Sequence, residues 1–373
     1  MNDFLLNKWT RRDFLENAAK LCFLAGLSAV LPGCGKTEPL SDVPKTEVEI
    51  KATVETVATP TGDFEPAYLK LHRTGELKER AEELWAIMEN CRLCPRTCGA
   101  NRLEGASGFC RAPGTELVVS ASHAHFGEER PLVGRGGSGT IFLTHCNLRC
   151  VFCQNYTISH LGRGSETDID GFAVMMLQLQ RSGCHNINLV TPTHYSPHIL
   201  KAIDVAAAHG LRLPIVYNTS GWERMEILAF LDGVVDIYLP DIKYWDSAMA
   251  AKYSAEAESY PEITKAAILE MHRQVGVVKL TEKDIAQSGL MIRHLVMPND
   301  VSGSEKIMAW IAEHLPKETF VNIMVQYTPA HKAYDYPDIS RRVTAAEYQA
   351  VVEKAQALGL TNLDIQGAGW LQR

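Results

Sequence analysis

Three cysteines in the middle of the chain have a spacing suited to metal chemistry. They are Cys146, Cys150 and Cys153, separated by three and then two residues. Thiolates are soft ligands that prefer iron–sulfur clusters or zinc to hard cations. A structural zinc site takes four protein ligands, whereas three thiolates on a four-iron cube leave one iron open to a small molecule. The triad therefore predicts a [4Fe–4S] cluster with an open iron; the alternative is a zinc loop that borrows a ligand from elsewhere.

A second group of cysteines precedes the triad. It comprises Cys91, Cys94, Cys98 and Cys110, and the intervening prolines and glycines allow the tight turns that a small metal cage needs. Four thiols in one short segment predict a second metal site, occupied by zinc or by a second iron–sulfur cluster. A disulfide pair is the alternative if the protein is exported. Cys184 stands alone and is expected to be a buried apolar residue.

The elements that must position the triad alternate regularly from residue 139 onward. The expected strands cover 140–143, 187–190, 214–217, 235–239, 290–296 and 321–325, and the expected helices between them cover 171–181, 197–209, 223–231, 261–274 and 304–315. Such alternation favours right-handed βαβ units and a parallel sheet. Six units are fewer than the eight of a closed barrel. We therefore predict an α/β fold: a partial (β/α)6 TIM-type barrel with an N-terminal cysteine-rich segment.

Helices are also expected on both sides of this barrel. Apolar residues near helical spacing predict a helix over about 65–89. A last helix is expected over 345–358, preceded by Thr344 and with Glu347 three residues later, which is the spacing of a capping box. The segment 363–366 is the last one in the expected order of elements. The triad itself follows the first expected strand directly, so it lies at the end of the barrel where such folds place their active sites.

The triad and its position resemble a known family. Cys-x3-Cys-x2-Cys directly after the first strand of a barrel, with Phe152 before the last cysteine, resembles the radical S-adenosylmethionine (SAM) superfamily. The resemblance covers about residues 139–327. Within the superfamily the chain looks most similar to the PflX-like group, relatives of pyruvate formate-lyase activating enzyme. The segments that carry this likeness are 137–142, 153–156, 186–194 and 238–243.

The resemblance implies a cofactor pair and a reaction. The [4Fe–4S] cluster would bind SAM at its open iron and cleave it reductively to a 5′-deoxyadenosyl radical, which abstracts hydrogen from a substrate. A protein glycine is the substrate that the activating enzymes indicate, with a small molecule or another polypeptide as alternatives. An electron donor, either flavodoxin- or ferredoxin-like or another reductase, is the expected partner. Catalytic residues beyond the cofactor ligands are not predicted.

The same resemblance places candidate SAM ligands at the strand ends. Asp241 and Lys243 match the Asp-x-Lys pair of activating enzymes. The Gly-Gly-Glu segment of those enzymes is replaced here, so Thr191 and Thr193 are the candidates for its contact with the SAM amino group. Further candidates on the same rim are Ser220 and Arg293. Nearby, His194 and His198 are expected to be either a proton relay or structural histidines of a loop.

The N-terminus has the pattern of an export signal. Arg11 and Arg12 lie in a segment that resembles a twin-arginine signal, and a short apolar stretch leads to a box in which Cys34 would be the lipidated residue. This predicts twin-arginine export to the periplasm or to the membrane surface, with Cys34 as a membrane tether. The alternative is a cytoplasmic protein whose arginine pair is fortuitous.

Composition and length bound the remaining function classes. The chain has 373 residues, 46% of them hydrophobic, and a formal charge of −7 with no long basic run, which argues against a nucleic-acid partner. The expected divisions are a signal over 1–36, a flexible tether over 37–65, the N-terminal helix with the four cysteines over 66–136, the barrel over 137–330 and an extension over 331–373. A non-catalytic iron–sulfur or zinc carrier or scaffold is the alternative function.

Overall fold

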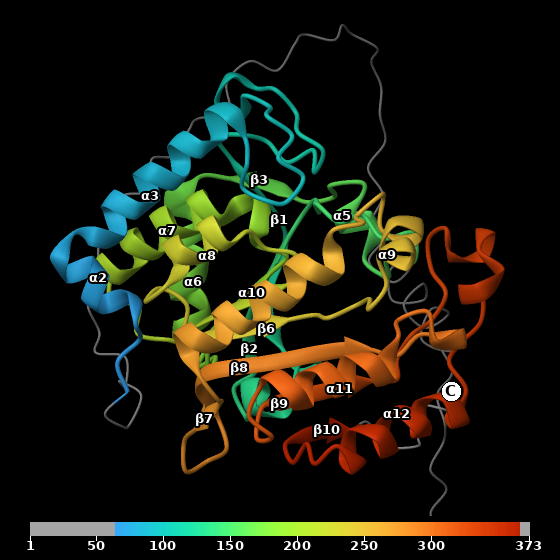
Figure 1. Ribbon diagram of the computed structural model, residues 1–373. Coiled ribbons are helices and arrows are strands. Elements are labelled where there is room, and N and C mark those ends of the chain that lie inside the picture. The colour runs from blue at the N-terminus through green and yellow to red at the C-terminus, as the bar shows by residue number, and fades with distance from the viewer. Residues whose placement is uncertain (1–63, 366–373) are drawn as a thin grey trace, which may run out of the picture. The chain divides into compact units, whose positions relative to one another are not determined.

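A computed structural model of the protein describes residues 64–365 (Figure 1). The predicted export signal, the lipidation site at Cys34 and the predicted tether lie outside the described residues, apart from the last positions of the tether. Among the described residues, no helix is both long and apolar enough to cross a membrane.

A parallel sheet whose strand order follows the chain forms the centre of the molecule. All six predicted strands are present, although some of their ends differ by a few residues. Neighbouring strands are joined in parallel register from β2 through to β10, and the two ends of this series are not paired with each other in the described part of the chain. The parallel strands are β2 (Ser138–Leu143), β4 (Ile187–Val190), β5 (Ile215–Thr219), β6 (Ile237–Pro240), β8 (Ala286–Leu295), β9 (Phe320–Met324) and β10 (Leu363–Ile365).

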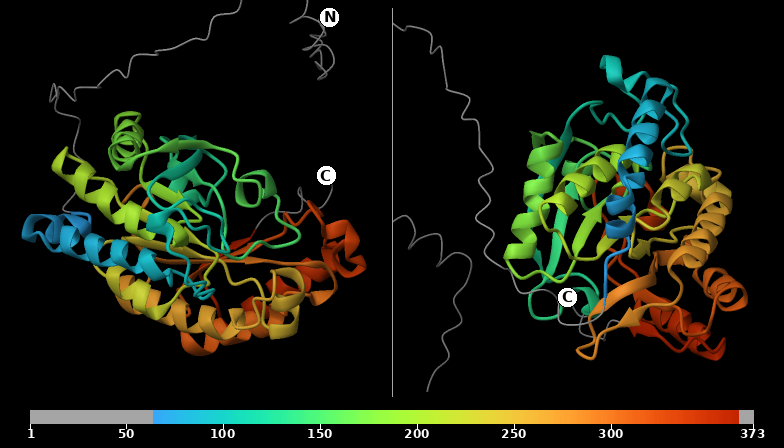
Figure 2. Two further views of the ribbon diagram at one scale, coloured as in Figure 1. Left: turned by 90° about the horizontal axis from the view of Figure 1, so that it is seen from above. Right: turned by 90° about the vertical axis from the view of Figure 1, so that its left-hand side faces the viewer.

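This order is that of a partial TIM-type barrel, so the predicted fold class is confirmed. The structure adds a seventh parallel strand, because β10 pairs with β9 and brings the predicted C-terminal extension into the sheet. The colours in Figure 2 follow one another around the sheet, as expected when each strand is followed by a helix on the outer face. The connecting helices are α6 (Ile169–Arg181), α7 (Ser196–Ala208), α8 (Met225–Leu231), α10 (Tyr260–Val275), α11 (Ser304–His314) and α12 (Ala345–Ala357).

Local signals account for where several helices begin. The Asp168 side chain accepts from the Gly171 N–H at the start of α6, as an N-cap residue does. The predicted capping box of α12 is confirmed, since Thr344 and Glu347 each accept from the other's backbone N–H.

The predicted helix over 65–89 is wrong as a single element. Gly75, with φ of +83°, divides it into α2 (Tyr68–Thr74) and α3 (Glu76–Ala86).

Two features of the sheet edge were missed by the sequence analysis. Strand β1 (Leu117–His125) pairs antiparallel with β2, and β3 (Ser165–Thr167) pairs antiparallel with β1. Three short elements lie outside the regular alternation: α4 (Arg130–Val133), α5 (Tyr156–Ser159) and α9 (Ser247–Tyr253). A small antiparallel strand, β7 (Lys279–Leu280), pairs with the start of β8.

The two faces of the sheet differ in what they bury. The larger core lies between the sheet and the outer helices and includes Leu189, Tyr217 and Ile292. A smaller apolar cluster on the other face includes Val216 and Met291 together with Leu132 of α4. Since successive strand residues point to opposite faces, Asn218 and Arg293 lie on the same face as this smaller cluster. The side chains that face the barrel interior thus change from apolar to polar toward the carboxyl ends of the strands.

Candidate active site at the carboxyl ends of the strands

The three-cysteine loop begins directly after β2. Two of its non-glycine residues, His145 with φ of +68° and Arg149 with φ of +51°, have left-handed backbone conformations. Such conformations are unfavourable for residues with a Cβ and persist only where the surroundings determine them. Val151 N–H donates to the Tyr253 carbonyl at 2.9 Å, which ties the loop to the end of α9. The loop is therefore held in a defined shape by contacts within the protein.

Each sulfur of the triad lies beside a potential hydrogen-bond donor. Leu148 N–H donates to Cys146 Sγ at 3.4 Å, Ser254 Oγ donates to Cys150 Sγ at 3.0 Å, and Cys153 Sγ lies 3.1 Å from Ser159 Oγ. Hydrogen bonds to cysteine sulfur are one of the means by which proteins adjust an iron–sulfur cluster.

Burial changes the pKa of two thiols of the triad. Burial raises the pKa of Cys146, and it raises the pKa of Cys150 to about 12. A coordinated metal reverses this preference, because its charge deprotonates the thiol. The donor set of three thiols with sulfur-directed donors therefore fits a [4Fe–4S] cluster.

The described cysteines are all free thiols, and this includes the four of the N-terminal group. The predicted alternative of a disulfide pair there has no counterpart among residues 64–365. Within the same residues, no three His, Cys, Asp or Glu side chains are arranged to hold a single metal ion. Cys184 is buried, as predicted from the sequence.

An ion-paired group lies at the ends of β6 and β8. Lys243 Nζ is 2.5 Å from Asp241 Oδ2, and Arg293 Nε is 2.9 Å from Asp241 Oδ1. Burial disfavours the Asp241 carboxylate, yet Arg293 and Lys243 hold its pKa below the usual value. Burial also opposes the charge of Lys243, but Asp241 and then Cys150 raise its pKa. Lys243 thus lies within the electrostatic reach of both the strand-end carboxylate and the cysteine loop.

Two residues that the sequence analysis missed complete this group. Arg293 Nη2 donates to Asn218 Oδ1 at 2.6 Å, and Arg293 Nη1 lies 3.7 Å from Glu128 Oε2. Burial, partly opposed by Arg293, raises the pKa of Glu128 to about 7. Asn218 directly follows the expected strand 214–217 and could have been included on that ground. Glu128 follows the unexpected strand β1, so no local signal indicated it.

The remaining predicted SAM ligands lie in different settings. Thr191 has a left-handed backbone, with φ of +61°, and its N–H donates to the Asn218 carbonyl at 2.9 Å. Thr193 is buried and donates to Glu223 Oε1 at 2.6 Å, so its hydroxyl hydrogen is already used. The buried hydroxyl of Ser220 has no protein partner within the described residues. The structure therefore brings Asp241, Lys243 and Arg293 together, while Thr193 serves a separate contact.

The two predicted loop histidines are buried and neutral. His194 Nε2 lies 2.8 Å from the Thr144 carbonyl, and His198 Nε2 lies 2.8 Å from the Gly114 carbonyl. Burial lowers the pKa of each to about 3, with the positive charge of Arg102 contributing. Both rings act here as donors to backbone carbonyls, which is a structural role.

The four-cysteine segment contacts the three-cysteine loop. Arg96 Nε donates to the Asn147 carbonyl at 3.0 Å, and Arg96 Nη2 donates to the Ser254 carbonyl at 3.1 Å. Asn147 follows Cys146 directly, and the hydroxyl of Ser254 bonds Cys150. The two groups of cysteines, separate in sequence, are thus connected through one arginine.

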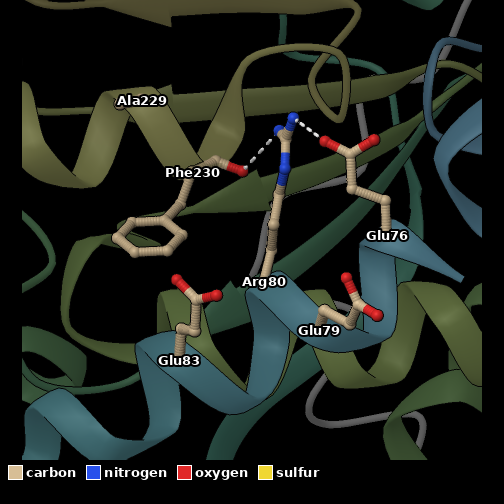
Figure 3. A pocket seen from close by; sticks show the side chains of 6 residues that line it. All are labelled: Glu76, Glu79, Arg80, Glu83, Ala229 and Phe230. Carbon is tan, nitrogen blue, oxygen red and sulfur yellow. Dashed lines mark hydrogen bonds and ion pairs between the residues drawn. The ribbon is translucent and has the colours of Figure 1, made fainter.

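A hollow elsewhere on the surface lacks comparable chemistry. It lies between α3 and α8 and is lined by Glu76, Glu79, Arg80, Glu83, Ala229 and Phe230 (Figure 3). Arg80 pairs with Glu76 and donates to the Asp232 carbonyl at 2.5 Å. This hollow contains no cysteine and no strand-end residue, so we assign the active site to the cysteine loop instead.

Comparison with known proteins identifies one curated relative. No protein-family profile matches the chain. Uncharacterized protein MJ0674 of Methanocaldococcus jannaschii is 33% identical over 285 residues, which cover 74% of this chain and 76% of that protein. The chain belongs to the family of this archaeal protein. Its relative is itself uncharacterized, so the family contributes no activity.

Two solved structures show a weak likeness. A radical SAM methyltransferase from Sphaerobacter thermophilus aligns with a TM-score of 0.38 and 16% identity, covering 60% of this chain and 66% of that one. Methylornithine synthase (PylB) aligns with a TM-score of 0.37 and 11% identity, covering 78% and 81%. At such TM-scores these likenesses carry no argument. The strand order and the loop after β2 agree with the resemblance at the level of the radical SAM superfamily, while the PflX-like group is not confirmed.

Proposed function

We propose that this protein is a radical SAM enzyme. The observation that carries the proposal is the position of Cys146, Cys150 and Cys153 directly after the first parallel strand, with the Asp241–Lys243–Arg293 group beside them. When bound, a [4Fe–4S] cluster supplies the electron that cleaves SAM and generates the 5′-deoxyadenosyl radical. The chain's own residues then have to bind SAM, hold its charged groups and keep water from the radical.

The strand-end group has the charges that SAM requires. Lys243 is placed to face the SAM carboxylate, because it interacts electrostatically with Cys150 of the loop and its partner Asp241 fixes its position. Arg293 holds Asp241 from the other side. Thr191 and Ser220 are the proposed contacts for the SAM amino group and ribose. We give Thr193 a lesser part, since its hydroxyl is engaged by Glu223.

The substrate would meet the radical on the inner face of the barrel. That face carries polar groups near Arg293, among them Asn218, Glu128 and Asn188. The resemblance supports a protein glycine as hydrogen donor, in the manner of glycyl-radical activation; a small molecule or another polypeptide is the competing substrate. We propose a flavodoxin- or ferredoxin-like protein, or another reductase, as electron donor.

Cell location is a separate part of the proposal. It rests on Arg11, Arg12 and Cys34, which predict twin-arginine export and a lipid tether. A reporter that is active only after twin-arginine export, fused behind the N-terminal segment, tests it. Equal export after both arginines are changed to lysine would refute the signal and favour a cytoplasmic enzyme.

A non-catalytic iron–sulfur or zinc carrier is the second candidate function. Two groups of cysteines in contact through Arg96 favour it, because adjacent metal centres are what an electron carrier needs. It predicts bound metal without SAM cleavage. An electron carrier would have no need of the buried strand-end ion pairs, which is why we rank it second.

Anaerobic SAM cleavage distinguishes the two functions. The full chain is reconstituted with iron and sulfide and given dithionite and SAM, and 5′-deoxyadenosine is quantified. Cys150→Ala is the test variant and Cys184→Ala the matched control, since both remove a buried thiol but only Cys150 lies in the loop. Release by wild type and control, and none by Cys150→Ala, supports the proposal. No release from wild type with an intact cluster favours the carrier.

A further inference from the structure

The four-cysteine segment contains a buried cation whose position calls for explanation. Arg102, between Cys98 and Cys110 in sequence, has only 1% of its surface exposed. Its Nη1 donates to the His194 carbonyl at 2.8 Å and its Nη2 to the Pro113 carbonyl at 2.6 Å. Its Nε has no acceptor, and no carboxylate in residues 64–365 forms an ion pair with it.

A buried guanidinium without a counter-charge is strongly unfavourable. Burying an ion costs several kcal/mol unless an opposite charge compensates it. The side chains around Arg102 offer none: His194 and His198 are buried and each donates a ring N–H to a backbone carbonyl, and the guanidinium itself bonds only two carbonyls. Arg102 lies within electrostatic reach of Cys110, so the missing negative charge is expected on that side.

We infer that Cys91, Cys94, Cys98 and Cys110, which are not drawn together as a closed set of ligands in this structure, come together around a metal centre of net charge −2, zinc or a four-iron cube, and that Arg102 is its counter-cation. Four thiolates contribute −4, and either a zinc ion or an oxidised [4Fe–4S] core contributes +2. The charge on the centre thus supplies what Arg102 lacks. This inference does not depend on SAM cleavage.

The local backbone supports such a centre. Gly99 N–H donates to the Cys91 carbonyl at 3.0 Å, and Cys91 N–H donates to the Ala100 carbonyl at 3.1 Å, so the turn brings Cys98 back to Cys91. At Gly108 a Cβ would lie 2.8 Å from Cys98 Sγ, a closer approach than a side chain tolerates. The chain thus keeps the space around this sulfur free. Three of the four thiols are buried, and Cys98 is exposed.

The centre would also act on the three-cysteine loop. Arg96 lies two residues after Cys94 and donates to the carbonyls of Asn147 and Ser254. Its guanidinium also packs over the rings of Phe109, at 4.0 Å, and Trp222, at 4.8 Å. Fixing Cys94 on a metal therefore fixes Arg96 and, through it, the backbone next to Cys146.

Metal analysis of a variant without the SAM cluster tests the inference. In the full chain, Cys146, Cys150 and Cys153 are all changed to alanine, and zinc, iron and sulfide are measured after anaerobic purification. We expect about one zinc, or about four irons with matching sulfide, per chain. Either result supports the inference and identifies the metal. A folded protein with no more metal than a variant lacking all seven cysteines overturns it, whether or not the wild type cleaves SAM.

Substitution of Arg102 tests its part. The readout is the rate at which a chelator removes metal from the same triple-alanine background. Arg102→Gln is expected to accelerate release at least tenfold, whereas Arg102→Lys, which keeps the charge, stays within about threefold of the parent. If the centre is a cube, Arg102→Gln also lowers its reduction potential, since loss of a nearby positive charge disfavours the added electron.

The effects of Arg102→Gln on metal release and on reduction potential can be separated from misfolding. Circular dichroism and thermal unfolding establish that each variant is folded before metal release is compared. Equal release rates and equal potentials for the parent and Arg102→Gln would show that Arg102 is no counter-cation. If Arg102→Gln does not fold, the metal content of the triple-alanine variant still decides whether the centre exists.

Discussion

The two groups of cysteines differ in how the fold holds them. The three-cysteine loop is positioned by regular structure, because it follows β2 directly and lies beside strand ends that carry Asp241 and Arg293. The four-cysteine segment has little regular structure of its own and contains the buried Arg102, which forms no ion pair within the part of the chain that the structure describes. Three ligands leave a cluster open for chemistry, whereas four close a metal centre. On the functions proposed above, the first region would catalyse, and the second would stabilise the fold or relay electrons.

The largest expected effect separates the two regions by activity. Cys150→Ala should reduce 5′-deoxyadenosine formation at least a hundredfold, to background, because the cluster loses one of its ligands. Cys94→Ala should remove the second metal while SAM still binds, as measured by equilibrium binding of labelled SAM. Loss of SAM binding in both variants would show that the regions act as one site.

Asp241 offers the next largest effect. Asp241→Asn leaves Lys243 and Arg293 without their shared carboxylate, and breaking such a largely buried pair costs roughly 3 kcal/mol. We expect a corresponding loss in the free energy of unfolding in guanidinium chloride, together with weaker SAM binding. The exposed pair of Arg273 and Asp232 is the control, since Asp232→Asn should cost under about 1 kcal/mol. Equal costs would show that the strand-end ion pairs have no special role.

The raised pKa of buried Glu223 should make the free energy of unfolding of the protein depend on pH. Burial raises its pKa from 4.5 to about 7, and Thr193 and Thr219 donate to the same carboxyl oxygen. A carboxyl whose folded pKa is raised is destabilising once it must ionise, so stability is lost as pH rises from about 4.5 to 7, by at most about 3 kcal/mol.

The uncharged analogue Glu223→Gln isolates this contribution. Wild type should lose more stability than Glu223→Gln between pH 5 and pH 8, as measured by thermal unfolding at each pH. Because Glu128 and Asp236 also have raised pKa values, the variant keeps part of the pH dependence. Identical slopes for both proteins would contradict the assignment of Glu223.

A smaller effect is expected from the space around Cys98. Gly108→Ala introduces the Cβ that would lie 2.8 Å from Cys98 Sγ. We expect several-fold faster chelation of the second metal, with SAM cleavage reduced by less than about threefold. Ser107→Ala, an exposed neighbour, is the matched control. Faster metal loss in both variants would attribute the effect to the loop as a whole.

The smallest effect is expected outside both regions. Thr344→Ala removes the capping box of α12 and should cost about 1 kcal/mol of stability in chemical denaturation. Metal content and SAM cleavage should stay as in wild type. A change in either would mean that the C-terminal helix is coupled to the cysteine regions.

The sequence predicted those parts of the site that depend on local order. The triad, the strand that precedes it and the Asp241–Lys243 pair are close in sequence to the elements that hold them. The antiparallel edge could not be predicted, because β1 is defined by its pairing with β2 and β3. Glu128 was missed for the same reason, since it reaches Arg293 only across the sheet.

Amino-acid order alone determined the alternating strands and helices and the spacing of the cysteines in the two groups, because periodicity and ligand spacing are local properties. Only the tertiary structure decided that Arg102 is buried with no carboxylate partner among residues 64–365, and that Arg96 joins one group of cysteines to the other. It also decided that the Thr193 hydroxyl donates its hydrogen bond to Glu223. Burial, electrostatic compensation and hydrogen bonding between distant residues depend on which segments come together, and that is settled only when the sheet and its helices are assembled.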